Sequence, residues 1–466
     1  MNPFRAFADY CQLNWHLYHL SPSRLRRWHE HAVIHLVERV RAASPFYRDL
    51  YDGRQVASLE DFRLLPTINK ASMMAHFDTL NTEGLKLADV MAFALQKEQE
   101  KDYLGYYQDR FVVGLSSGTS GNKGIYVTPR ELTERLPGVF LARGGVRLSD
   151  LPLRILFILR VFSQGFADIN APMIQLHYLS SMTDPREIVT TCNQLRTNVL
   201  MAPPSLLRQL LPLSKQIMIP LRRIITHAEV LEPLEKERLE QAFHAPVVEI
   251  YQASEGQIAS PCRCGSLHIN EDLVYVELLD EQGRPIPEKA GFRSSRMLVT
   301  NLVNTVQPLL RYEMNDLVEL GGSCPCGSSF RVLSRIIGRN DDVLYLRDRS
   351  GRLRPVYPDL VSRWIITTND RIREFLVEQD SPDHLAVTLD LARASDQTDQ
   401  TPAGVQDDGL SLANRLKARF EQELAAFDIV CSISIQLKQI PMPADNRKRK
   451  RFVSSMTLNN HESVIK

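Results

Sequence analysis

The stretch Val113–Gly124 reads Val-Gly-Leu-Ser-Ser-Gly-Thr-Ser-Gly-Asn-Lys-Gly and has the composition of a phosphate-binding loop. The apolar run Phe111–Val113 at its start predicts a buried strand from which the loop leaves. Glycines let the backbone approach a ligand, successive N–H groups form an anion-binding hollow, and hydroxyls add donors. The predicted contacts are Ser116, Ser117, Gly118, Thr119, Ser120 and Gly121. The spacing is not that of the P-loop nucleoside triphosphatases, and a flexible Ser/Gly surface loop is the alternative.

Length and composition indicate a soluble globular protein of two domains. The chain has 466 residues, more than one core usually organises, of which 44% are hydrophobic and 24% charged. With a formal net charge of +1, the chain has no overall electrostatic field that would favour binding to nucleic acid or to a membrane. Residues 1–20 include Asp9, Asn14 and His16 and do not read as a secretory signal or a spanning helix. The cytoplasm is the expected compartment.

Alternating apolar runs and helical patterns after the loop predict an α/β fold of layered sheets and helices. Arg154–Phe162 and Asn198–Ala202 are short apolar runs typical of buried strands. Pro203–Ser205 follows the second run and predicts the start of a helix over Leu206–Leu211. Between these strands, Ser163–Phe166 is expected to be a loop.

Two features nearer the N-terminus are structural and carry no chemistry. Apolar residues at helical spacing predict an amphipathic helix within His29–Tyr51, ended by Pro45. A second helix is predicted to begin near Lys70, with Thr67 as its N-cap.

Four further stretches place polar residues directly after apolar ones. They read Arg-Ile-Ile-Thr-His-Ala-Glu (223–229), Val-Val-Glu-Ile-Tyr-Gln-Ala-Ser-Glu (247–255), Pro-Leu-Leu-Arg-Tyr-Glu-Met-Asn-Asp-Leu-Val (308–318) and Ile-Gly-Arg-Asn-Asp-Asp-Val (337–343). In this order, and together with the loop, they resemble the motifs of the adenylate-forming (acyl-CoA synthetase-like) superfamily. Ser-Pro-Phe-Tyr at 44–47 and Leu-Pro-Thr-Ile-Asn-Lys at 65–70 resemble its phenylacetate–CoA ligase-like branch, and the resemblance spans nearly the whole chain.

The resemblance implies that the first two motifs bind the nucleotide. The turn along the adenine would comprise His227, Ala228 and Glu229. Tyr251 would stack near the adenine, and Ser254 stands for the family's usual Thr. Glu255 would coordinate the Mg²⁺ that bridges the phosphates, because this hard cation prefers carboxylate oxygens.

The later motifs imply a ribose site, a hinge and a catalytic lysine. Asp316 would accept hydrogen bonds from both ribose hydroxyls, and Arg339 would reach the ribose or the α-phosphate. Asp341 would be the hinge between the domains. The family's C-terminal lysine stabilises the reacting carboxylate and α-phosphate, and it corresponds to Lys448, with Lys450 as the alternative.

The chain departs from the family's pattern at several positions. Gln252, Asn315 and Arg447 stand where glycine is usual. Asn tolerates the left-handed conformation better than most residues, so the turn at Asn315 is expected to be kept. Leu346–Pro355 predicts an extended hairpin with four arginines, and Arg447–Arg451 is a run of five cations that makes nucleic-acid binding an alternative.

Two Cys-x-Cys-Gly turns predict a structural metal site. Cys262-Arg-Cys264-Gly and Cys324-Pro-Cys326-Gly repeat one pattern, in which the glycine lets backbone and sulfurs converge. Four thiolates are the usual complement of a structural Zn²⁺, and His268 is the alternative ligand in a Cys₃His site. A closed four-ligand site has no open position for catalysis. Four unliganded thiols are the other alternative.

From about Asn340 onward the pattern is that of a small α+β unit. Phe375–Gln379, Leu385–Leu391 and Ile429–Leu437 alternate as strands do, and Ser411–Phe427 has apolar residues at helical spacing. The predicted domains are 1–339 and 340–466. The first is an adenylation domain that holds the ATP, Mg²⁺ and carboxylate site, with a Zn-stapled insertion at 256–330. The second is a mobile C-terminal domain.

The resemblance implies a two-step ligase. A carboxylic acid, aromatic or aryl-acetic by the branch, attacks the α-phosphate of ATP to give acyl-adenylate and pyrophosphate, and coenzyme A then displaces AMP. The alternatives are transfer to a separate carrier protein or to an amine, a non-catalytic nucleotide-binding protein, and a nucleic-acid-binding zinc protein. No membrane is expected. The oligomeric state is open, with a homodimer among the outcomes.

Overall fold

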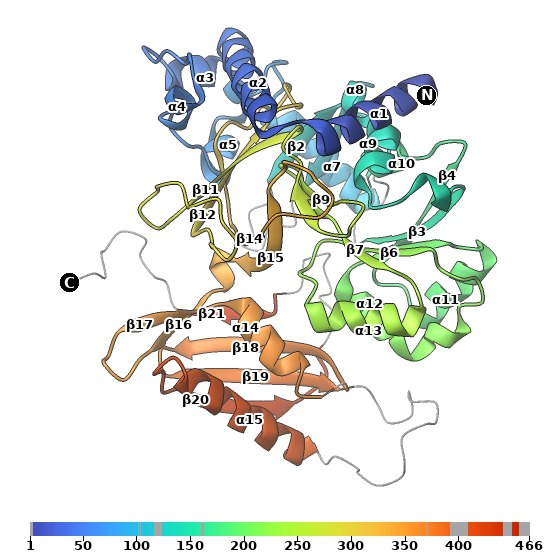
Figure 1. The fold of residues 1–466 in the computed structure, drawn as a ribbon, viewed down its shortest axis with the longest axis vertical. Helices are drawn as coiled ribbons and strands as arrows, with labels where there is room; N and C mark the ends of the chain where they lie inside the picture. The colour runs from blue at the N-terminus through green and yellow to red at the C-terminus, as the bar shows by residue number, and fades with distance from the viewer. Residues whose placement is uncertain are drawn as a thin grey trace. The chain divides into compact units, whose positions relative to one another are not determined.

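The computed structural model describes residues 3–100, 102, 104–115, 124–159, 163–369, 371–391, 409–440 and 450–455. The chain divides into two compact units (Figure 1). The first comprises Met1–Leu231 and Glu235–Ile336, and the second comprises Glu232–Leu234 and Ile337–Lys466. This division by contacts falls inside one strand, and the hinge expected at Asp341 stays a prediction.

The first unit contains a parallel sheet of five strands in the order β4-β3-β5-β6-β7. The strands are β3 (Leu153–Leu159), β4 (Ile174–Ser180), β5 (Val199–Ala202), β6 (Arg223–Thr226) and β7 (Val247–Glu249). Helices α11 (Pro185–Gln194), α12 (Pro204–Leu210) and α13 (Pro233–Phe243) pack on one face of it (Figure 1). The strands predicted within 154–162 and 198–202, and the helix after Pro203, are confirmed.

Both faces of this sheet are apolar because helices cover both of them. One core joins Leu156 of β3 to Leu207 of α12 and Leu239 of α13. The other joins Phe157 of β3 to Phe140 of α9 (Leu136–Arg143). A parallel sheet that is buried on both faces is built from continuous apolar runs, which is why these strands can be predicted from the sequence.

Antiparallel sheets complete the first unit. One has the order β14-β15-β10-β9-β8 and is built from β8 (Tyr251–Ala253), β9 (Gly256–Pro261), β10 (Leu267–Ile269), β14 (Asp316–Leu320) and β15 (Val332–Arg339). A second consists of β11 (Val274–Leu279), β12 (Arg296–Asn301) and β13 (Tyr312–Met314). One apolar core joins these sheets to α2 (Pro22–Ala43), α3 (Pro45–Leu50), α4 (Leu59–Arg63) and α5 (Lys70–Ala75). The hairpin β1 (Phe111–Leu115) with β2 (Ile125–Pro129) brackets the predicted phosphate loop.

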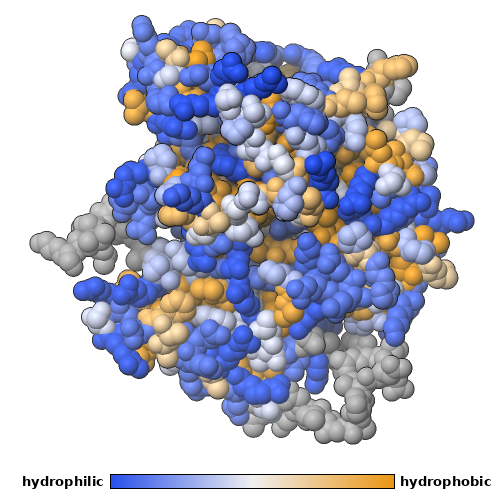
Figure 2. All heavy atoms as spheres, viewed as in Figure 1, coloured by the Kyte–Doolittle hydropathy of each residue, from blue (hydrophilic) through white to orange (hydrophobic). Residues whose placement is uncertain are grey.

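The other described elements of this unit are helices and 3₁₀ turns. They are α1 (Pro3–His19), α6 (Phe77–Leu80), α7 (Leu87–Glu100), α8 (Arg130–Thr133), α10 (Gln164–Ala167), η1 (Leu148–Asp150) and η2 (Leu211–Gln216). One side of α1 packs on α9, and exposed apolar side chains gather over its N-terminal end (Figure 2), which carries Phe4 and Phe7. Within the described part of the chain, no helix is long and apolar enough to cross a bilayer.

The first predicted helix is longer than expected and ends differently. It begins at Pro22, where Ser21 caps it, and not near His29. Ser44 is the C-cap of α2 and the N-cap of α3, so Pro45 ends one helix and begins the next. The residue before a proline is pushed toward extended geometry, which suits both cap positions.

The predicted helix cap is wrong. Thr67 does not cap α5, because Asn69 stands directly before the helix and forms a capping box with Ser72. Asn315 joins β13 to β14 without a left-handed backbone, since it is not among the described non-glycine residues with positive φ.

Helix α10 occupies the stretch that the sequence predicts as a loop at 163–166. Asp168 directly follows this single turn and accepts hydrogen bonds from Gln164 Nε2 (2.7 Å) and Tyr106 Oη (2.5 Å). These contacts hold the turn in helical geometry, and four residues are too few to show a helical period in sequence.

The second unit is a four-stranded sheet covered by two helices. The antiparallel pair β18 (Ile372–Ser381) and β19 (His384–Leu391) is extended by parallel edge strands β20 (Ser432–Leu437) and β21 (Phe452–Ser454) in the order β20-β19-β18-β21. Helices α14 (Pro358–Ile366) and α15 (Gly409–Ala425) share its core, to which α15 contributes Leu412, Leu416, Phe420 and Leu424 as predicted. After the turn η3 (Asn340–Asp342), β16 (Leu344–Arg347) pairs with β17 (Leu353–Val356) as the predicted Arg-rich hairpin.

Candidate functional site

The carboxyl ends of the parallel strands carry the polar residues predicted for the nucleotide site. In open α/β sheets, ligands bind at this edge. Ser205, after β5, donates from its backbone N–H (3.1 Å) and its Oγ (2.8 Å) to the carboxylate of Glu229, after β6. Two neighbouring turns at this edge are thereby fixed to each other.

The turn before Glu229 has an unusual backbone. Ala228 has a φ of +65°, which is uncommon for a residue with a Cβ. Its neighbour His227 is buried, with its ring edge-on to Phe157 at 5.2 Å between centroids. Strained backbone concentrates at ligand sites, so this turn is a candidate ligand contact. The adenine contact of His227 stays a prediction.

Two carboxylates, Glu255 and Asp316, lie close enough to interact electrostatically. Each accepts a phenol hydrogen bond of 2.6 Å, Glu255 Oε1 from Tyr126 Oη and Asp316 Oδ2 from Tyr251 Oη. Tyr312 Oη lies 3.2 Å from Tyr126 Oη and extends the chain of phenols. The three tyrosines are buried and the two carboxylates half-buried, so the carboxylates sit at the edge of a rigid polar wall.

The surroundings of Glu255 favour a cation. Burial raises the pKa of Glu255 and the charge of Asp316 adds to the rise, whereas the hydrogen bond from Tyr126 opposes it. Burial also raises the pKa of Tyr126, so its phenol remains a donor. A hard divalent cation relieves the cost of placing negative charge here, and it prefers carboxylate oxygens. Glu255 therefore has the chemistry expected of a Mg²⁺ ligand.

Three residues of this centre are missed by reasoning from the sequence: Tyr126, Tyr312 and Asn301. Asn301 Nδ2 donates to the backbone oxygen of Glu255 at 2.8 Å and holds the turn in place. Tyr312 belongs to the Arg-Tyr of a motif already singled out, so its signal was available. Tyr126 and Asn301 stand in ordinary strand patterns, and their contacts could not be read from them.

Several predicted residues lie outside the described part of the chain: Ser116, Ser117, Gly118, Thr119, Ser120, Gly121 and Lys448. The strands on either side of residues 116–123 are described, and Leu115 pairs with Ile125 across their base. Tyr126 follows Ile125 directly. The described strand end at Ile125 is therefore next in the chain to the residue whose side chain contacts Glu255.

The other predicted residues are placed individually. Ser254 is exposed next to Glu255. Arg339 ends β15 and Asp341 lies in η3, both at the start of the second unit. Lys450 precedes β21, and its neighbour Arg451 pairs with Glu374 at 2.7 Å, which removes one cation from a nucleic-acid-binding run. The roles of these residues toward a nucleotide stay predictions.

A compact group of potential metal ligands is formed by the turns between β9 and β10 and between β14 and β15, together with His268 on β10. The ligand atoms of Cys262, His268, Cys324 and Cys326 all lie within 4.8 Å of one another. Cys262 Sγ and Cys324 Sγ are 3.6 Å apart, and Cys326 Sγ is 3.5 Å from His268 Nε2. Cys264, predicted as the fourth thiolate, is exposed and outside this group, whereas the alternative ligand His268 lies within it.

The two Cys-x-Cys-Gly turns fold alike. In each, the glycine N–H donates to the first cysteine's carbonyl, Gly265 to Cys262 at 2.9 Å and Gly327 to Cys324 at 3.1 Å. Both glycines have left-handed backbones, with φ of +83° and +81°. The sequence repeat therefore reflects a repeated geometry, in which the φ requires glycine.

His268 is oriented as a metal ligand. Its Nδ1 donates to the carbonyl of Phe330 at 2.8 Å, which leaves Nε2 with its lone pair facing the thiols. Burial raises the pKa of Cys326 to about 12, a cost that a bound cation would offset. Three sulfurs and one nitrogen match the Cys₃His set of structural zinc sites.

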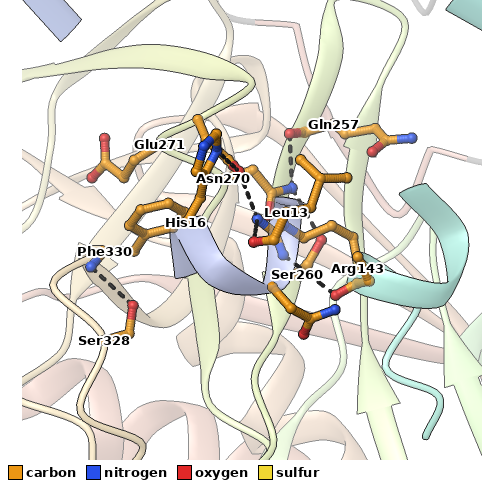
Figure 3. A network of polar contacts seen from close by, with 12 residues as sticks. Leu13, His16, Arg143, Gln257, Ser260, Asn270, Glu271, Ser328 and Phe330 are labelled. Atoms are coloured by element: carbon orange, nitrogen blue, oxygen red, sulfur yellow. Dashed lines mark hydrogen bonds and ion pairs between the residues drawn. The ribbon is translucent and has the colours of Figure 1, made fainter. Parts of the chain in front are cut away.

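A buried polar network lies near this cluster (Figure 3). Its centre is the segment 270–272 between β10 and β11. Asn270 Nδ2 donates to Gln257 O (2.9 Å) and Ser260 Oγ (3.0 Å) on β9. Arg143 of α9 donates to Asp272 Oδ2 (2.8 Å) and to Leu13 O of α1 (2.9 Å). The network attaches the N-terminal helix to the sheet that carries the thiols.

Known proteins resemble the chain in sequence and in fold. No protein-family model matches it. It is 26% identical over 384 residues to a phenylacetate–coenzyme A ligase of Thermus thermophilus, covering 77% of this chain and 79% of that protein. It is 30% identical over 177 residues to the protein CapK of Staphylococcus aureus, covering 37% of this chain and only 36% of that protein.

Among solved structures, a 2-hydroxyisobutyryl-CoA ligase in complex with 2-HIB-AMP has the same fold. The TM-score is 0.71 at 16% identity, covering 95% of this chain and 91% of that one. The predicted fold class of layered sheets and helices is confirmed. These similarities confirm the resemblance to the adenylate-forming superfamily and to its phenylacetate–CoA ligase-like branch that the motifs predict.

Proposed function

We propose that the chain activates a carboxylic acid with ATP, releasing pyrophosphate, and transfers the acyl group from the adenylate to coenzyme A. The observation that carries the proposal is the pair Glu255 and Asp316, which stand at the motif positions for Mg²⁺ and ribose and each accept a hydrogen bond from a buried tyrosine. The name of the Thermus relative and the 2-HIB-AMP in the similar structure support the same chemistry.

In the first half-reaction, the substrate carboxylate attacks the α-phosphorus of ATP and pyrophosphate leaves. Asp316 accepts one bond from Tyr251, and its carboxylate retains lone pairs for the two ribose hydroxyls. Glu255 would hold Mg²⁺, which would neutralise charge on the phosphate oxygens. The hydrogen bond from Tyr126 keeps the Glu255 carboxylate oriented.

In the second half-reaction, the thiol of coenzyme A attacks the acyl carbonyl and AMP leaves. A carboxylate alone is a poor acyl donor, and adenylation supplies the leaving group. Lys448, with Lys450 as the alternative, and Arg339 supply positive charge, and the second unit reorients about Asp341. These roles rest on the motif positions.

The acid and the acceptor are the finer parts of the proposal. The branch favours an aromatic or aryl-acetic acid. A separate carrier protein or an amine is the alternative acceptor, and a homodimer is compatible with either. Zn²⁺ at Cys262, His268, Cys324 and Cys326 is proposed to be structural. Thiols kept for a metal suit the cytoplasm, where disulfides are rare.

The test is carboxylate-dependent ATP–pyrophosphate exchange across benzoic, aryl-acetic and fatty acids, with and without coenzyme A. Exchange with one class identifies the acid, and AMP that accumulates only with coenzyme A identifies the acceptor. Glu255→Gln and Asp316→Ala should each lower exchange by about 100-fold or more. The matched control is Glu313→Gln. Glu313 lies on β13, and its carboxylate pairs with Arg296 of β12. Full exchange in both site variants would contradict the site.

The catalytic lysine is tested by the same assay. Lys448→Ala should abolish exchange while sparing ATP binding, because the lysine acts on the reacting phosphate rather than on the adenosine. If Lys450→Ala has this effect and Lys448→Ala does not, the catalytic residue is Lys450.

A further inference from the structure

The exposed side of α2 carries two histidines one helical turn apart. His31 and His35 are four residues apart, so their side chains lie one above the other. Their Nε2 atoms are 2.9 Å apart and their ring centroids 4.1 Å apart. Both residues are exposed, while Val33 and Val37 on the other side of the helix are buried in the core. The pair therefore stands on a rigidly anchored helix.

Glu38 orients one of the two rings. Its Oε2 lies 3.3 Å from His35 Nδ1, and the two side chains are 67% and 61% exposed. A neutral imidazole that donates from Nδ1 to a carboxylate keeps its lone pair on Nε2. His31 then supplies the hydrogen between the two Nε2 atoms. This carboxylate–histidine arrangement is the one that orients histidine ligands at metal sites.

We propose that His31 and His35 form a surface chelate for a late divalent transition metal, Cu²⁺ or Ni²⁺. The two Nε2 atoms are already 2.9 Å apart, so small rotations of the rings bring both within a metal–nitrogen distance of about 2.05 Å of one ion. Cu²⁺ and Ni²⁺ accept imidazole nitrogen in tetragonal geometry, and Cu²⁺ leads the divalent affinity series.

Binding requires only local changes. Because both rings are exposed, rotation about their Cβ–Cγ bonds turns both lone pairs toward one ion, and water completes the coordination. The hydrogen on His31 Nε2 moves through solvent to Nδ1 of the same ring, so the ring stays neutral. The nitrogens are neighbours only in the helix, so a bound metal stabilises the folded chain over the unfolded one.

This site is chemically distinct from the thiol cluster. Cys262, Cys324 and Cys326 offer soft sulfur ligands on the β9–β10 and β14–β15 turns, and His268 on β10 adds one nitrogen, a set that is typical of Zn²⁺. The proposed chelate offers only imidazole nitrogens, and it lies on the exposed side of α2. Different metals and different spectra therefore separate the two.

The test uses the untagged full chain, supplied with one equivalent of Zn²⁺ and freed of excess metal. Calorimetric titration with Ni²⁺ should show one site of micromolar affinity, weakened about tenfold or more in His31→Asn and in His35→Asn. Glu38→Gln should weaken it less. His177→Asn removes an exposed histidine on β4 and should change nothing. Ni²⁺ should raise the thermal midpoint of the natural chain but not that of His35→Asn.

Copper supplies an independent readout. Electron paramagnetic resonance of the Cu²⁺-loaded chain should show a tetragonal signal with coupling to two nitrogens, lost in His31→Asn. Ni²⁺ affinity that is unchanged in both histidine variants would overturn the proposal. So would binding at millimolar metal only, or an intense sulfur-to-copper absorption that places the copper on the cysteines.

Discussion

At the scale of the residue, Tyr126 shows how a site forms from contacts that local sequence does not reveal. Its strand reads Ile-Tyr-Val-Thr-Pro, where an aromatic is ordinary, and its partner Glu255 lies 129 residues later. Tyr126→Phe keeps the ring and removes the hydrogen bond that orients a proposed Mg²⁺ ligand. Loss of such a partner typically weakens metal affinity 10–100-fold, so we expect about tenfold weaker apparent Mg²⁺ affinity in pyrophosphate exchange.

Tyr251→Phe is the matched variant, because it removes a phenol hydrogen bond of equal length, 2.6 Å, that Asp316 accepts. It should raise the KM for ATP and leave the Mg²⁺ dependence unchanged, since Asp316 is placed at the ribose. An unchanged Mg²⁺ titration in Tyr126→Phe would show that Glu255 is oriented without the phenol.

At the scale of the element, α1 and α2 are attached through buried charges to the segment 270–272. His29 Nε2 donates to Glu271 O at 2.6 Å, and Arg331 pairs with the Glu271 carboxylate at 2.7 Å. Burial lowers the pKa of His29. Burial would raise the pKa of Glu271 and Asp272, but the Arg331 and Arg143 guanidiniums outweigh it and lower both.

Lowered pKa values make this attachment sensitive to acid. At the same pH the unfolded chain binds more protons than the folded chain. The free energy of unfolding therefore decreases as pH falls below the pKa that each group has in the unfolded chain. For His29 this window begins at about pH 6.5, and for the two carboxylates at about pH 4. We expect the free energy of unfolding, from urea titrations, to fall on the order of 1 kcal/mol between pH 7 and 5 through His29.

His29→Gln keeps a donor for Glu271 O but cannot titrate. The free energy of unfolding of this variant should change little between pH 7 and 5, and it should still fall steeply below pH 4. His19→Gln, an exposed histidine on α1, is the control. Equal slopes for His29→Gln and the natural chain would assign the loss to other groups.

At the scale of the whole molecule, burial decides what could be predicted. The run at 154–159 predicts a buried strand because both faces of its sheet are covered, and the spacing of Leu412 and Leu416 predicts α15 because one face of that helix is covered. The order of the motifs predicts the ligase fold. The sequence offers two ligand sets, four thiolates or three thiolates with His268, and cannot decide between them, because the choice depends on the β10–β15 pairing that places His268 beside Cys326, 58 residues away.

Two strands of the same sheet, β9 and β14, connect the thiol cluster to the carboxylates. β9 runs from the residue after Glu255 to the residue before Cys262, and β14 begins at Asp316 and leads toward Cys324. A metal that joins the two turns therefore sets the relative position of the strands that carry Glu255 and Asp316. We expect metal removal to disturb the site as well as the fold.

Two variants that make the same change, cysteine to serine, test this prediction. Cys326→Ser should lose the bound zinc, lower the thermal midpoint by several degrees and reduce pyrophosphate exchange, because metal binding energy contributes directly to folding. Cys264→Ser should keep one zinc per chain and near-normal stability, because its thiol is exposed and outside the ligand group. Metal analysis with thermal unfolding distinguishes them. If Cys264→Ser loses zinc and His268→Ala keeps it, the site is the four-thiolate one, and the strands are joined through Cys264.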